Sequence, residues 1–295
     1  MDTIISMFEK DLQEACKDSF GVECSIQFMD VQKNNGISHR AVIIKEPGYS
    51  TFPMIYTDEM LSQIASGKKS SRETACDVIR IYQEHKDSAL TGIDLCSLTK
   101  ESMLSKVFCQ LINADKNRSQ LLGIPSKEFL DLAVVYRFPV LTNEEGIASI
   151  LVNNSMLQGY DISPEELHSA AMENTCLQEF HTIPMDDVIA EFIKDDIESD
   201  NGNIMWVLTN TKRLYGAAVL LHLEHLSKLA DKLKDDLYVL PSSIHEVIAV
   251  PVSILDVKEL KNMVYSANTT YVAEEDALGC NVYLYSRKDN TITIA

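Results

Sequence analysis

The residues with the clearest chemical potential form a short polar segment between two apolar runs. Asp235–Pro251 reads DDLYVLPSSIHEVIAVP, and its polar centre contains Ser242, Ser243, His245 and Glu246. A serine hydroxyl, an imidazole and a carboxylate are the parts of a nucleophilic hydrolase, in which the histidine activates the serine and the acid orients the histidine. The segment therefore raises both a catalytic and a binding interpretation.

The spacing of these residues favours binding. Ser243 and His245 are two apart and share one face of a strand, whereas the acid of a triad contacts the imidazole on the side away from the serine. The sequence also lacks the G-x-S-x-G turn that exposes a nucleophilic serine. We assign no catalytic residue and expect a non-catalytic binding or interaction protein. Its candidate binding residues are Ser242, Ser243, His245 and Glu246, with serine hydroxyls that bond to backbone groups.

An alternative hypothesis is a hydrolase or metal-dependent enzyme centred on His245. His222 and His225 lie three apart in the sequence HLEH, a spacing that can hold one metal ion on a helix face, and His245 is a possible third ligand. Against this, the pattern is not the H-E-x-x-H of metalloproteases, and histidines on a long amphipathic helix usually lie at its border with solvent.

Charge limits the classes of partner. The 295 residues contain 44 acidic and 26 basic side chains, giving a formal charge of −18, and 45% of the residues are hydrophobic. Nucleic acids and anionic membranes repel such a chain at long range, so we expect neither as a partner. A protein or a small-molecule ligand is the expected partner, and no cofactor is predicted.

The cysteines and the N-terminus predict a cytoplasmic location. Seven scattered cysteines without a C-x-x-C pair indicate neither a disulfide framework nor a zinc site, so we expect free thiols. The N-terminal stretch 1–15 is acidic and has the apolar spacing of an amphipathic helix, unlike a signal peptide. No apolar run reaches the length of a membrane span.

Turn residues and apolar spacing predict an α+β fold, with antiparallel hairpins and a sheet packed by amphipathic helices. Asn34-Asn35-Gly36 predicts a hairpin between flanking alternating runs. The predicted sheet core comprises strands in 131–152, 204–209 and 236–251, and the last of these forms a hairpin. The pattern at 282–294 predicts another hairpin.

Helices are expected at 71–85, at 163–175 after a Ser-Pro-Glu-Glu start, and over 215–233, where Gly216 and two alanines allow close packing. The break at 115–125 predicts two subdomains, 1–120 and 121–295.

Several segments together resemble a bacterial family of unknown function found in Firmicutes, domain of unknown function 5688. They are NNG at 34–36, PMIYTDEML at 53–61, DLAVVYRF at 131–138, GYDISPEELHSAAMENT at 159–175, WVLTN at 206–210, YGAAVLL at 215–221 and the segment 235–251. Residues 147–264 are also more faintly similar to the YtpQ-like proteins. The two resemblances imply a shared α+β core and no particular reaction.

Overall fold

The computed structural model describes residues 2–49, 52–87, 98–143, 146–192 and 204–295. Its contacts divide the chain into two units, which are 1–33 with 37–94, and 34–36 with 95–295. The division therefore lies between 94 and 95 instead of near residue 120. A boundary at 120 would separate β4 (Phe108–Asn113) from β6 (Leu132–Asn143), which are hydrogen-bonded neighbours in one sheet. The α+β fold class is confirmed.

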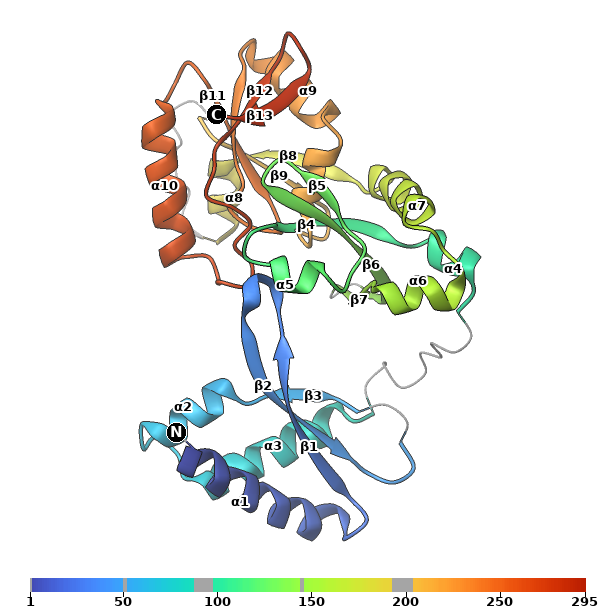
Figure 1. Ribbon diagram of the computed structural model, residues 1–295. Helices are drawn as coiled ribbons and strands as arrows, with labels where there is room; N and C mark the ends of the chain where they lie inside the picture. Colours follow the sequence, from blue (N-terminus) through green and yellow to red (C-terminus); the bar gives the residue numbers. More distant parts are fainter. Residues whose placement is uncertain (1, 50–51, 88–97, 144–145, 193–203) are drawn as a thin grey trace. The chain divides into compact units, whose positions relative to one another are not determined.

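The first unit is a three-stranded antiparallel sheet with helices packed on it (Figure 1). Its elements are α1 (Asp2–Phe20), β1 (Ser25–Gln32), β2 (Ser38–Lys45), β3 (Met54–Tyr56), α2 (Asp58–Ala65) and α3 (Ser71–His85). The predicted hairpin of β1 and β2 is confirmed, as is the helix at 71–85. Phe8 and Leu12 of α1, Val42 of β2 and Tyr82 of α3 meet in one buried cluster, which explains the helical spacing of apolar residues.

The second unit contains two antiparallel sheets. The smaller sheet has β4, β5 (Lys127–Phe129), β6 and β7 (Gly146–Leu151), with β6 as the strand to which the others pair. The larger sheet has the order β13 (Thr291–Ile294), β12 (Tyr283–Ser286), β10 (Leu237–Leu240), β11 (Val247–Pro251), β9 (Trp206–Asn210) and β8 (Phe180–Pro184). The hairpins predicted at 237–251 and 282–294 are confirmed.

The prediction of one sheet core was wrong. The strands of 131–152 belong to the smaller sheet, whereas those of 204–209 and 236–251 belong to the larger one. Strand β6 is bonded to β4 and β5 along one part of its length and to β7 along the other, and β9 lies between β11 and β8. Both strands already have hydrogen-bonded neighbours within their own sheets, and the described strands β6 and β9 do not pair with each other.

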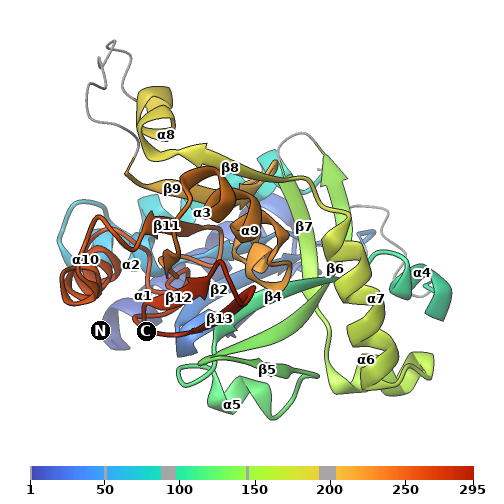
Figure 2. The same ribbon diagram turned by 90° about the horizontal axis from the view of Figure 1, so that it is seen from above.

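Helices complete the second unit, and α7 lies along the smaller sheet (Figure 2). They are α4 (Lys100–Leu104), α5 (Arg118–Leu121), α6 (Asn154–Tyr160), α7 (Pro164–Cys176), α8 (Met185–Phe192), the 3₁₀ helix η3 (Gly216–Leu221), α9 (Glu224–Leu233) and α10 (Val257–Thr270). The predicted capping box at Ser163 and Glu166 is present at the start of α7. In the part of the chain that the structure describes, no helix has the length and apolar character needed to cross a membrane.

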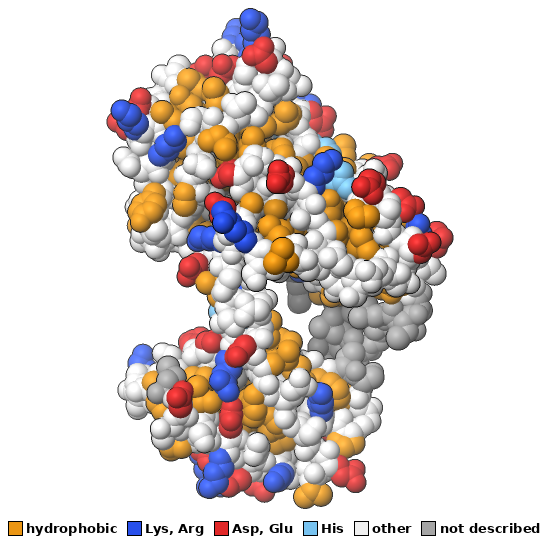
Figure 3. Space-filling view, in the orientation of Figure 1, with side chains coloured by type: hydrophobic (Ala, Val, Ile, Leu, Met, Phe, Trp, Pro, Cys, Tyr) orange, Lys and Arg blue, Asp and Glu red, His pale blue; other side chains and the backbone are white. Residues whose placement is uncertain are grey.

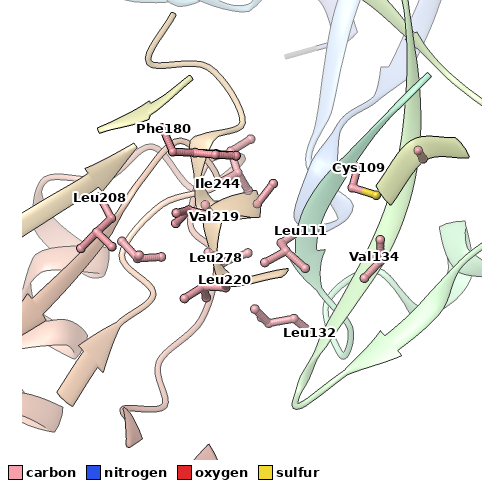
Figure 4. Packing of buried hydrophobic residues seen from close by; sticks show 14 of the residues in the cluster. Cys109, Leu111, Leu132, Val134, Phe180, Leu208, Val219, Leu220, Ile244 and Leu278 are labelled. Carbon is pink, nitrogen blue, oxygen red and sulfur yellow. The ribbon is translucent and has the colours of Figure 1, made fainter. Parts of the chain in front are cut away.

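The long helix predicted at 215–233 is interrupted. Tyr215 has a left-handed φ of 57°, η3 follows it, and His222 adopts φ −127° and ψ 87° before α9 begins. The residues from Gly216 to Leu220 are all buried, because η3 inserts between the two sheets. Figure 4 shows Val219 and Leu220 between Leu208 of β9 and Leu111 of β4. This central position of η3 places Tyr215 at the candidate site.

Candidate functional site

The tip of the hairpin, which contains the polar candidate residues, is largely buried. Between β10 and β11, Ser242 and Ser243 are 7% and 5% exposed, and Ile244 is buried as well. Ser243 forms an isolated antiparallel bridge with Ala277, and the Ile244 N–H donates to the carbonyl of Asp276 at 2.8 Å. The tip is therefore anchored to the segment 274–277 and does not project into solvent.

The imidazole of His245 is engaged at both nitrogens. The backbone N–H of Tyr215 donates to Nδ1 at 3.2 Å, and Nε2 lies 3.3 Å from Asp276 Oδ1. Because Nδ1 accepts a hydrogen bond, the proton of the neutral ring is on Nε2 and is donated to Asp276. The ring also stacks on Tyr215, with centroids 5.8 Å apart. His245 has no nitrogen left to act as a base.

The other candidate residues of the tip have different surroundings. Ser243 Oγ accepts the His245 N–H at 2.8 Å, which is the backbone use expected of a turn serine. Ser242 Oγ is buried without a hydrogen-bond partner among the described residues. Glu246 is half-buried, and its carboxylate makes no hydrogen bond or ion pair with any residue in the described ranges. None of the three therefore forms a triad with His245.

A close backbone approach fixes the position of Tyr215. The neighbouring Gly216 lies so near β9 that a Cβ there would overlap Thr209 Oγ1 and lie 2.5 Å from the His245 carbonyl oxygen. Thr209 Oγ1 donates to that same carbonyl at 2.8 Å. Only a glycine fits at 216 without displacing β9 or the tip, which is the close packing expected from the small residues of this segment.

A basic side chain contacts the ring of Tyr215. The guanidinium of Arg137 lies 4.8 Å from the ring centroid, and Phe108 lies 5.9 Å from it. Arg137 donates to Ser149 and to Gln110, but it has no carboxylate partner among the described residues. Burial lowers the pKa of the Arg137 guanidinium from its ordinary value. The positive charge is therefore stabilised by neutral acceptors and an aromatic face.

The tripeptide 34–36 belongs to the second unit and contacts the same segment as the tip. Asn35 has a φ of 62° and donates from Nδ2 to the carbonyls of Glu274 and Ala277, both at 2.7 Å. Its own N–H donates to Asn117 Oδ1 at 2.7 Å, and Asn117 Nδ2 donates to Asn35 Oδ1 at 3.0 Å. The segment 274–277 is thus bonded to the NNG turn and to the PSSIHE tip.

The histidines of the metal hypothesis do not form a ligand set with His245. Over the described ranges, no three His, Cys, Asp or Glu side chains are placed to hold a metal ion. His225 lies 3.5 Å from Glu224 and packs edge-on against Phe180, and burial lowers the pKa of both His222 and His225. His245 contacts Asp276 and Tyr215 instead.

A cavity of about 500 Å³ borders the site through Phe108. Its lining residues are Ser105, Lys106, Phe108, Pro139, Val140, Asn174, Leu177 and Gln178. Gln178 accepts a hydrogen bond from Asn210, whose amide also bonds to the Leu214 carbonyl just before Tyr215. In the face seen in Figure 3, acidic, basic and hydrophobic side chains are interspersed over the second unit.

Sequence reasoning missed Tyr215, Arg137, Asp276 and Asn35 as parts of the site. The glycine at 216 indicated close packing and the NNG sequence indicated a turn, but neither pattern indicated which distant segment would be contacted. Asp276 and Arg137 carried no local signal, because an isolated acidic or basic residue is usually at the surface.

Comparison with known proteins gives a family and no activity. A family model described as a family of unknown function, DUF5688, matches residues 5–287. No curated protein and no solved structure matches the chain. Because the family model spans nearly the whole sequence, the chain belongs to the DUF5688 family.

Proposed function

We propose that this protein is a non-catalytic intracellular binding protein. The observation that carries the proposal is the engagement of His245, whose Nδ1 accepts from Tyr215 and whose Nε2 faces Asp276. Ser243 Oγ accepts a backbone N–H and lacks a base to remove its proton. These groups connect the hairpin tip to Tyr215 and to Asp276, so their hydrogen bonds serve the structure of the second unit.

We place the ligand in the cavity beside Phe108. The tip fixes Tyr215, and Tyr215 packs on Phe108, which lines the cavity. Leu177 on the rim is 76% exposed, so an apolar surface is available to a ligand. A volume of about 500 Å³ is within the range of small-molecule sites.

The ligand is proposed to carry an acidic group. Lys106 lines the cavity, is exposed, and has no ion-pair partner among the described residues. Arg137 lies directly opposite Phe108 on the neighbouring strand and also lacks a carboxylate partner there. The positive charge of Lys106 in the lining, with that of Arg137 on the strand beside Phe108, supports a carboxylate or phosphate as the acidic group.

Binding is tested by calorimetry with succinate, citrate and inorganic phosphate, each beside a neutral analogue. The expected result is saturable binding of an acid that weakens in Lys106→Ala. Lys288→Ala is the matched control, because Lys288 is exposed in the same unit and lies away from the cavity. Equal affinities in the two variants, or no saturable binding by any of the three acids, would contradict the assignment of the cavity.

The catalytic alternative is tested separately. A fluorophosphonate probe labels an activated serine covalently, and we expect no labelling of the native protein beyond that of Ser243→Ala. Labelling that is lost in Ser243→Ala, or stoichiometric metal that is lost in His245→Ala, would favour the enzyme centred on His245.

A further inference from the structure

Two cysteines of the first unit lie against each other. Cys16 is on α1 and Cys24 directly precedes β1, and their sulfur atoms are 2.8 Å apart. A disulfide bond is about 2.04 Å long, so less than about 1 Å of movement separates this contact from a covalent bond. The intervening turn includes Gly21 at a φ of 87°, which lets the chain reverse sharply after the helix.

We propose that Cys16 and Cys24 form a redox-active dithiol that closes to an intramolecular disulfide on reaction with a low-molecular-weight disulfide. The pair is separate from the cavity of the second unit, so the inference does not depend on the proposed function. The expectation of free thiols then describes the reduced state of the pair, which is the state in the structure.

Burial determines the order of the two exchange steps. Cys16 is 1% exposed, and burial raises the pKa of its thiol to about 12, so it is a poor first nucleophile. Cys24 is half-buried, so it is the more accessible of the two cysteines to a dissolved reagent. The Cys24 thiolate attacks the reagent disulfide, which breaks its S–S bond, forms a mixed disulfide at Cys24 and releases one reagent thiol.

The second step occurs inside the protein. Cys16 loses its proton to water and attacks Cys24 Sγ, which breaks the mixed disulfide and releases the second reagent thiol. Two protein thiols are thereby oxidised, and the reagent disulfide is reduced to two thiols. The contact at 2.8 Å favours this step over attack by another molecule in solution, because the attacking sulfur already lies beside its target.

The other described cysteines lack this arrangement. Cys76, Cys176 and Cys280 are exposed, so each is open to a reagent, and Cys109 is buried in the second unit. Exposed single cysteines stop at the mixed disulfide, because no second thiol is at hand to displace the reagent. Cys76 is a matched internal control, since it lies in the same unit on α3.

Peptide mapping tests the inference on the full-length protein. The protein is treated with glutathione disulfide, remaining thiols are alkylated, and trypsin digestion is followed by mass spectrometry without reductant. Cleavage after Lys17 places Cys16 and Cys24 on different peptides, 11–17 and 18–33, each with one cysteine. The expected result is a disulfide-linked pair of these peptides that separates on reduction, with glutathione on Cys76.

Two variants test whether Cys16 is the thiol that displaces the reagent. Cys16→Ser is expected to accumulate the mixed disulfide at Cys24, whereas Cys76→Ser is expected to leave the linked pair unchanged. Alkylation of both Cys16 and Cys24 in the native protein, under conditions that modify Cys76, would overturn the inference. A mixed disulfide that persists at Cys24 in the native protein would overturn it too. These refuting results require no variant, so a folding defect in Cys16→Ser leaves the test intact.

Discussion

Replacing Gly216 by alanine tests whether the close approach of η3 to β9 holds the site together. The new Cβ would overlap Thr209 Oγ1 and lie 2.5 Å from the His245 carbonyl oxygen and 2.8 Å from the Asn210 nitrogen. The last two atoms belong to the backbone of the tip and of β9, so they cannot rotate away. The substitution therefore forces η3 away from the larger sheet.

The expected loss of stability follows from the contacts. Overpacking a closely packed position costs about 1 to 3 kcal/mol. Separating Thr209 Oγ1 from the His245 carbonyl costs about 0.5 to 1.5 kcal/mol more. Replacing glycine restricts the unfolded chain and returns about 0.4 to 1 kcal/mol. The free energy of unfolding should fall by about 0.5 to 4 kcal/mol in Gly216→Ala.

Urea unfolding followed by tryptophan fluorescence measures this change. Trp206 is the single tryptophan and is buried in β9, so its signal reports the second unit alone, which matters in a chain of two units. Gly159→Ala is the control, because nothing lies within 4 Å of a Cβ there and the residue is in α6. The control should gain about 0.5 to 1 kcal/mol. A Gly216→Ala protein as stable as the wild type would refute the reasoning.

Two further predictions concern side-chain hydrogen bonds of the second unit. The buried Tyr283 donates its hydroxyl to Asp131 at 2.6 Å, so Tyr283→Phe should lower the free energy of unfolding by about 1.5 to 3 kcal/mol in the same urea assay, and an unchanged midpoint would contradict this. The backbone N–H of Ser163 holds the pKa of Glu166 at about 2, below its ordinary 4.5. This carboxylate therefore contributes stability above pH 4.5 that is lost as the pH falls toward 2. The difference in melting temperature between wild type and Glu166→Gln should shrink over that window, whereas a constant difference would argue against a role for the charge.

The hairpins and capped helices were predictable because their signals are local. Asn34-Asn35-Gly36 supplies the backbone conformations of a tight turn, and alternating runs on either side pair across it. The capping box at Ser163 and Glu166 starts α7 at the predicted place through hydrogen bonds three residues apart. In both cases the residues that bond to one another are close together in the sequence, so the local pattern is enough to predict the structure.

The predictions that were wrong depend on distant parts of the chain. The run 215–233 has helical spacing, but insertion of η3 between two sheets imposes a left-handed Tyr215 and ends the 3₁₀ helix before α9. Likewise, alternation indicates that 131–152 forms strands without indicating which strands they join. Pairing is decided by how the chain satisfies its backbone hydrogen bonds overall.

By itself, the sequence determined the α+β class, most hairpins, the candidate residues Ser243 and His245, and the family. Only the tertiary structure decided what these residues do, since His245 bonds to Tyr215, 30 residues before it, and to Asp276, 31 residues after it. A residue's type and neighbours specify which hydrogen bonds it can make. Burial and chain topology specify which partner it meets, and here both nitrogens of the His245 imidazole meet groups from distant parts of the chain.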